Sequence, residues 1–135
     1  MRLFMIDEVS SVIMELDGVT RVLALEHGED NSTTGWLDGN EISETNARRL
    51  YLAALGILQE GTTDADIPET PPEYRITVKL LSGEDDVLEL YSISPTQFML
   101  VHNGVNTGFF VYRMTLNQNL INALEILDRG EDLPM

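Results

Sequence analysis

The chain has 135 residues, 43% of them hydrophobic, and its aromatic residues are four tyrosines, four phenylalanines and one tryptophan. This length and composition are typical of one globular domain with one core, and they exclude an intrinsically disordered chain. Its 23 acidic and 8 basic residues give a formal net charge of −15, which repels phosphate backbones and anionic membrane surfaces. We therefore expect no nucleic-acid partner and no direct membrane insertion, since no apolar run approaches the ~20 residues of a spanning helix.

The cysteine count and the N-terminus bear on the compartment. Because the sequence contains no cysteine, disulfides, thiolate metal sites and cysteine nucleophiles are excluded. Residues 1–6 are apolar, but Asp7 and Glu8 follow too soon for the ~7–15-residue core of a signal peptide. The sequence therefore indicates either a cytoplasmic protein or one whose export or anchoring segment lies outside this sequence.

The chain begins with a predicted β-hairpin. Residues 11–16 and 20–26 are strand-like, and Asp17-Gly18 between them is a strong hairpin signal. A helical reading of residues 1–16 is the alternative, because apolar residues there also recur at helical spacing.

A short strand over residues 34–37 leads into the first predicted helix, residues 43–58. Apolar residues repeat every three or four positions in that helix, Ser43 is a suitable N-cap and Gly61 a natural stop. Trp36 lies in the short strand, and we expect it to be buried against this helix. A stacking platform for a ligand is its alternative role.

The second half of the chain is predicted to contain four strands and a helix. The strands cover residues 75–80, 87–93, 98–102 and 109–114, with a glycine-containing loop over 103–108. The helix is expected to begin at a capping box formed by Thr115 and Gln118 and to end at Gly130. The tail over residues 131–135 has nothing in the sequence to hold it.

These elements predict a single α+β domain over residues 1–135. We expect an antiparallel sheet of about five to seven strands packed on two helices. The halves 1–59 and 74–130 both contain a hairpin, further strands and then a helix, which makes an internal strand-hairpin-helix duplication a candidate. Residues 60–73 between them are acidic and proline-rich, and they are read as a connecting surface loop.

The strands over 98–102 and 109–114 carry the one residue-level indication of a binding surface. They are apolar on both faces, whereas a strand of a one-layer antiparallel sheet usually needs one apolar face. The second set consists of Met99, Val101, Phe110 and Tyr112. This set is predicted either to be covered by the chain itself or to bind a protein partner or a second copy.

No catalytic constellation is present in the sequence. It contains neither a nucleophile elbow nor a glycine-rich phosphate loop, so we expect no catalytic residues and no cofactor. His27 and His102 are the sole imidazoles, and both fall at predicted strand ends beside turn glycines. A metal site built from these histidines and scattered carboxylates is the alternative hypothesis.

The order of features resembles a known bacterial family. A strand over residues 12–16, Gly35-Trp36-Leu37 before a helix, a Tyr-x-Ile-x-Val strand and paired glycine-turn hairpins are similar to domain of unknown function 4340. The resemblance extends over residues 12–127. It implies an α+β fold in extracytoplasmic proteins associated with gliding-motility-type ABC exporters, anchored by a further segment, and it carries over no catalytic residues.

The sequence thus predicts a non-enzymatic binding or assembly module, part of a bacterial envelope protein, that acts through protein contacts. The alternative is a metal- or ligand-binding sensor or enzyme that uses His27, His102 and carboxylates. An extracytoplasmic location follows from the resemblance alone, and a cytoplasmic one stays open.

Overall fold

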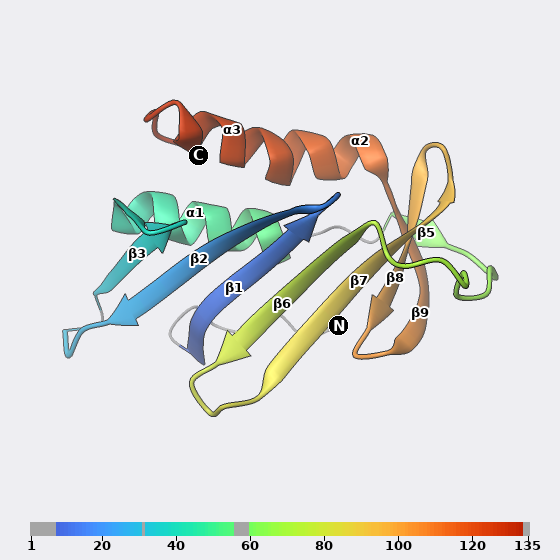
Figure 1. Cartoon of the computed structure of the whole chain (residues 1–135), viewed down its shortest axis with the longest axis horizontal. Coiled ribbons are helices and arrows are strands. Elements are labelled where there is room, and N and C mark those ends of the chain that lie inside the picture. The colour runs from blue at the N-terminus through green and yellow to red at the C-terminus, as the bar shows by residue number, and fades with distance from the viewer. Residues whose placement is uncertain (1–7, 31, 56–59, 134–135) are drawn as a thin grey trace.

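The computed structural model describes residues 8–30, 32–55 and 60–133, which form one antiparallel sheet with two helices on one face (Figure 1). Among these residues nine strands have the order β4-β3-β2-β1-β6-β7-β8-β9-β5. The strands are β1 (Val9–Leu16), β2 (Val19–His27), β3 (Thr33–Leu37), β4 (Asn40–Ile42), β5 (Gly61–Thr62), β6 (Tyr74–Leu80), β7 (Asp85–Ser94), β8 (Gln97–His102) and β9 (Val105–Tyr112). The first helix is α1 (Glu44–Leu55), and the second helix runs without a break through α2 (Arg113–Leu116), η2 (Asn117–Ile121) and α3 (Asn122–Asp128).

The α+β class and the main strands are confirmed, but the expected five to seven strands are too few. The additional ones include the short edge strands β4 and β5. Three hairpins are closed by two residues that both have positive φ, namely Asp17-Gly18, Asp38-Gly39 and Asn103-Gly104. This is the signature of a type I′ turn. The loop expected over 103–108 is therefore a two-residue turn, and β9 begins directly after it.

The two halves of the sheet have the same order of elements. In each, four consecutive strands form a meander and a helix follows, and the halves meet where β1 pairs with β6. The described part of residues 1–16 is the strand β1, so the helical alternative is wrong from Val9 onward; residues 1–7 lie outside the described residues.

The core lies between the sheet and the two helices. Its residues include the following, each at most 3% exposed: Val12, Met14, Leu23, Leu50, Ile76, Leu90, Phe98, Leu120 and Leu124. At Gly35 on β3 the first helix comes especially close, because a Cβ atom built there would lie 2.6 Å from the Cβ of Ala47. The absence of a side chain at Gly35 thus allows α1 to pack directly on the sheet.

The helix ends agree with the sequence in part. The hydroxyl of Ser43 accepts a hydrogen bond of 3.1 Å from the backbone N–H of Asn46, which confirms the predicted N-cap. The second helix begins at Arg113 rather than Thr115, and its N-cap residue makes no side-chain bond. The capping box is therefore wrong, whereas the stop at Gly130, with φ of 79°, is confirmed.

Residues 131–133 of the C-terminal tail are held, contrary to the expectation that the tail over 131–135 frays; residues 134–135 lie outside the described residues. Leu133 is 4% exposed, and its backbone N–H donates to Oδ1 of Asn46 at 3.0 Å. The Asn46 amide in turn donates to Asp132, and Arg49 donates to the carbonyl of Leu133. Two polar side chains of α1 thus fix the tail, which is a long-range contact that no local pattern predicts.

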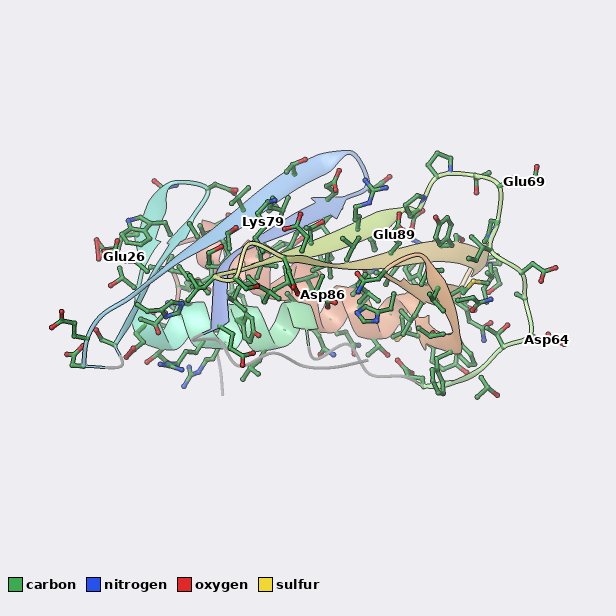
Figure 2. The ribbon with its side chains drawn as sticks, turned by 90° about the horizontal axis from the view of Figure 1, so that it is seen from below. Glu26, Asp64, Glu69, Lys79, Asp86 and Glu89 are labelled. Atoms are coloured by element: carbon green, nitrogen blue, oxygen red, sulfur yellow. The ribbon has the colours of Figure 1, made fainter. Side chains whose placement is uncertain are left out.

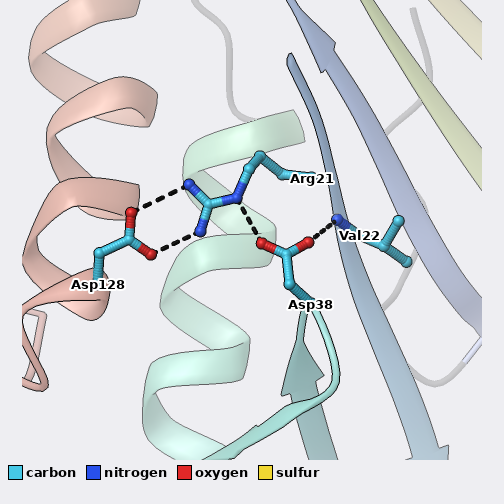
Figure 3. Close-up of polar contacts among 4 residues, drawn as sticks. All are labelled: Arg21, Val22, Asp38 and Asp128. Atoms are coloured by element: carbon cyan, nitrogen blue, oxygen red, sulfur yellow. Dashed lines mark hydrogen bonds and ion pairs between the residues drawn. The ribbon is translucent and has the colours of Figure 1, made fainter.

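A charged cluster ties the second helix to the other half of the sheet (Figure 3). Arg21 on β2 donates to both carboxylate oxygens of Asp128 on α3, at 2.6 and 3.1 Å, and to Asp38 at 2.5 Å. These bonds, foremost the one to Asp128, raise the pKa of the Arg21 guanidinium. Asp38 also accepts a bond of 2.8 Å from the backbone N–H of Val22.

Candidate functional site

A groove of about 1160 Å³ lies between the second helix and one end of the sheet. The sheet contributes the end of β1, the start of β6 and the β7–β8 turn, and the helix contributes residues of α2, η2 and α3. Tyr112 and Met114, which are 41% and 68% exposed, lie in its lining. Exposed large apolar side chains in a concavity are typical of a binding surface.

The helical wall of the groove contains a π-turn. In η2 the backbone N–H of Asn122 donates to the carbonyl of Asn117, an i→i+5 bond. Single π-turns inside α-helices are frequent at functional sites. The wide turn allows Asn117 and Asn122, five residues apart, to line the same groove together with Gln118. None of these three side-chain amides has a hydrogen-bond partner among the described residues.

Arg113 lines the groove, and several contacts fix its side chain there. Its guanidinium pairs with Glu73, donates to the carbonyl of Pro95 at 3.3 Å, and lies 4.2 Å from the ring centroid of Phe98. A charge-assisted bond and a cation–π contact hold this side chain in place. Arg113 therefore has a structural role, and its charge is balanced by Glu73.

Tyr74 lies beside Arg113 and is 8% exposed. Its ring packs against Phe98 with a centroid distance of 5.1 Å. Burial, and then the charge of Glu73, raise the pKa of the Tyr74 hydroxyl. The sheet end of the groove therefore presents a neutral phenol at neutral pH.

The uncompensated charges of the groove are negative. Asp17 and Glu125 are exposed, line it, and have no cationic partner among the described residues. Of the described residues that line the groove, Arg113 is the one cation, and Glu73 pairs with it. The groove can therefore accept apolar groups, hydrogen-bonding groups and positive charge.

The four residues predicted as partner-facing divide into a buried and an accessible pair. Met99 and Val101 lie on the face opposite the helices, the helix-free face, yet they are at most 1% exposed. Residues 63–73, between β5 and β6, cross this side of the sheet (Figures 1 and 2). Met99 and Val101 are buried within the chain and offer no surface to a partner.

Phe110 and Tyr112 are the accessible pair. Their rings meet edge to face with centroids 5.3 Å apart. Phe110 is half-buried next to Gly61 of β5, where a Cβ atom would come within 2.4 Å of its ring. Tyr112 reaches the groove, so it is the predicted partner residue that the structure places at the candidate site.

Trp36 lies elsewhere, and the expectation that it packs on the first helix is wrong. Its neighbour Gly35 faces α1, so Trp36 faces the opposite side, where it is half-buried and paired with Ala24 of β2. Trp36 does not line the groove. Stacking of a ligand on it stays a prediction.

The structure does not bring His27 and His102 together. They belong to β2 and β8, and β1, β6 and β7 lie between those strands. His27 contacts the carbonyl of Val9 at 2.7 Å, and His102 contacts Asp86 at 2.8 Å. Within the described ranges, no three His, Cys, Asp or Glu side chains are grouped so that they could hold a metal ion.

Sequence reasoning missed the groove, because it depends on the π-turn and on segments far apart in the chain. Leu116, Leu120 and Leu124 are buried and spaced by four residues twice in succession. In a regular α-helix this spacing drifts by about 40° per step. It is also common in ordinary helices, however, so it does not by itself predict a π-turn.

Comparison with protein-family models, with curated proteins and with solved structures gives no match. In the part of the chain that the structure describes, no helix has both the length and the apolar character needed to cross a membrane.

Proposed function

We propose that the protein is a non-enzymatic binding module that holds a protein partner in the groove beside the second helix. The observation that carries the proposal is the set of unpartnered amides of Asn117, Gln118 and Asn122 on the groove wall. Exposed amides without internal partners are free to bond a ligand, and the apolar surfaces of Tyr112 and Met114 lie beside them. Membership of an extracytoplasmic envelope protein, and descent of the two halves from a duplication, belong to the same proposal.

The size and shape of the groove fit a polypeptide segment better than a compact small molecule. Small-molecule pockets usually measure about 300–1,000 Å³ and enclose most of the ligand. This groove, at about 1160 Å³, runs between a helix and the ends of β1, β6 and β9. That shape favours a segment of polypeptide.

Nuclear magnetic resonance tests the proposal, because side-chain NH₂ groups of Asn and Gln give their own ¹⁵N signals. The labelled protein is titrated with capped pentapeptides of differing charge and hydrophobicity. We expect the side-chain signals of Asn117, Gln118 and Asn122 to shift with at least one peptide. Asn119 is exposed in the same turn but does not line the groove, so its side-chain signal is the internal control. Shifts confined to Asn119 or to the helix-free face would contradict the proposal.

A further inference from the structure

We infer that the occupant of the groove is an extended, basic segment of a partner protein, in which lysine or arginine alternates with apolar residues. This inference rests on the proposed function and specifies the partner's chemistry. Three features of the groove carry it: the wall amides, the exposed apolar side chains and the unpaired carboxylates.

The wall amides favour an extended segment over a helix. Each carboxamide can both donate and accept, as a peptide group does. In an extended segment the backbone N–H and C=O groups are free to bond such side chains, whereas a helix satisfies them internally. A helical occupant would leave Asn117 and Asn122 without backbone partners, so an extended one matches the wall better.

The apolar lining of the groove favours a bound segment in which every second residue is apolar. Successive side chains of an extended chain point to opposite sides. Those on one side can pack on Met114, Tyr112 and Ile121, of which Met114 is 68% exposed. The flexible thioether of methionine adapts to differently shaped apolar partners.

The charge of the groove specifies a basic segment. Asp17 and Glu125 line it without a cationic partner among the described residues, while Glu73 already balances Arg113. The net charge of −15 also attracts cations over a long range and repels acidic segments. The groove carboxylates and the net charge of the chain therefore both favour a positively charged partner.

The test compares three capped probes: the pentapeptide Lys-Val-Lys-Val-Lys, the same peptide with acetylated lysines, and a hydrocarbon-stapled helix with three lysines. Affinities come from the titration of the groove signals. We expect the lysine pentapeptide to bind about tenfold more tightly than either other probe at low salt. The preference over the acetylated peptide should shrink in 0.5 M NaCl, because salt screens exposed charges.

Two double variants separate the groove carboxylates from overall charge. Asp17→Asn with Glu125→Gln should remove most of the preference for lysine. Glu26→Gln with Asp64→Asn removes the same two charges from exposed positions far apart in Figure 2, and it should keep most of that preference. All four side chains are exposed, and melting curves verify that both variants fold.

Each outcome decides one of the two claims. If the acetylated peptide shifts the groove signals as strongly as the lysine peptide, or the stapled helix binds as well, the inference is wrong and groove binding stands. An equal loss in both double variants also overturns the inference. If no probe shifts the signals of Asn117, Gln118 or Asn122, the proposed function falls with it.

Discussion

The two halves share one topology, yet their helices use polar side chains in opposite ways. On α1, the amide of Asn46 is 6% exposed, and both its oxygen and its nitrogen bond the C-terminal tail. On the second helix, the amides of Asn117 and Asn122 have no partner among the described residues and line a groove. Under the proposed function, the second helix therefore supplies amides for a partner, whereas the amide of α1 holds the tail, and the first half also contributes Leu16 and Asp17 to the groove.

The largest effect is expected where the halves are alike, in the core. Leu50 on α1 and Leu120 on η2 are both 0% exposed. Leu50→Ala and Leu120→Ala should each lower the free energy of unfolding by about 2–5 kcal/mol, because each leaves a cavity. Urea denaturation measures both. A loss below about 1 kcal/mol for Leu120→Ala alone would mean that the π-turn is not packed as firmly as α1.

A smaller loss of stability is expected from alanine substitutions at two glycines that lie close to other atoms, and the loss should differ between them. A Cβ at Gly35 would meet the Cβ of Ala47, which cannot move without α1, whereas one at Gly61 would meet the movable ring of Phe110. Gly35→Ala should therefore cost about 1–3 kcal/mol of unfolding free energy, and Gly61→Ala less than about 1 kcal/mol. Thermal melts rank the two variants. The reverse order would contradict the close approach of α1 to β3.

The ion pairs of Arg21, which join the two halves, should contribute less to the free energy of unfolding than these packing contacts. Asp128→Asn removes one charge from the pair, and we expect a loss of about 0.5–1 kcal/mol at low salt that shrinks in 1 M NaCl. Glu131→Gln, in an exposed pair with Arg129, is the control and should change little. A loss that is the same at both salt concentrations would show that the contribution of Asp128 is not ionic.

The smallest effect concerns pH and Tyr74. Its pKa is raised in the folded protein, so its contribution to stability is complete below the unfolded value of about 10 and is lost as the pH rises through the folded pKa. Tyr74→Phe should therefore lose less stability than the unmodified chain between about pH 9 and 11. Urea midpoints over that range test this, with Tyr112→Phe, at a more exposed tyrosine, as the control. Identical slopes for the Tyr74→Phe variant and the unmodified chain would contradict the burial of the phenol.

Local signals predicted much of the fold. Alternation identified β6, Asp17-Gly18 identified the first hairpin, and Ser43 identified the start of α1. The Asp38-Gly39 pair carries the same turn signature and could have identified β4. β5, with two residues, is too short for any periodicity to indicate.

The site was less predictable, because it depends on contacts between distant parts of the chain. Alternation placed Met99 and Phe98 on opposite faces of the sheet, but the burial of Met99 on the helix-free face could be found in the structure alone. Trp36 was expected on the helix side, since a lone tryptophan suggests a core residue, yet Gly35 occupies that side. The groove joins Asp17, Tyr74 and Asn117, which are far apart in the sequence.

The proposed difference in role between the amides of the two helices is tested most directly by the affinity of the lysine pentapeptide for two matched variants. Asn117→Ala with Asn122→Ala removes wall amides, and Asn119→Ala removes an exposed amide outside the groove. We expect the double variant to bind about tenfold more weakly, through the loss of roughly two hydrogen bonds, and Asn119→Ala to bind as the unmodified chain does. Urea midpoints should stay unchanged in both. Unchanged affinity in the double variant, with its fold intact, would contradict the account.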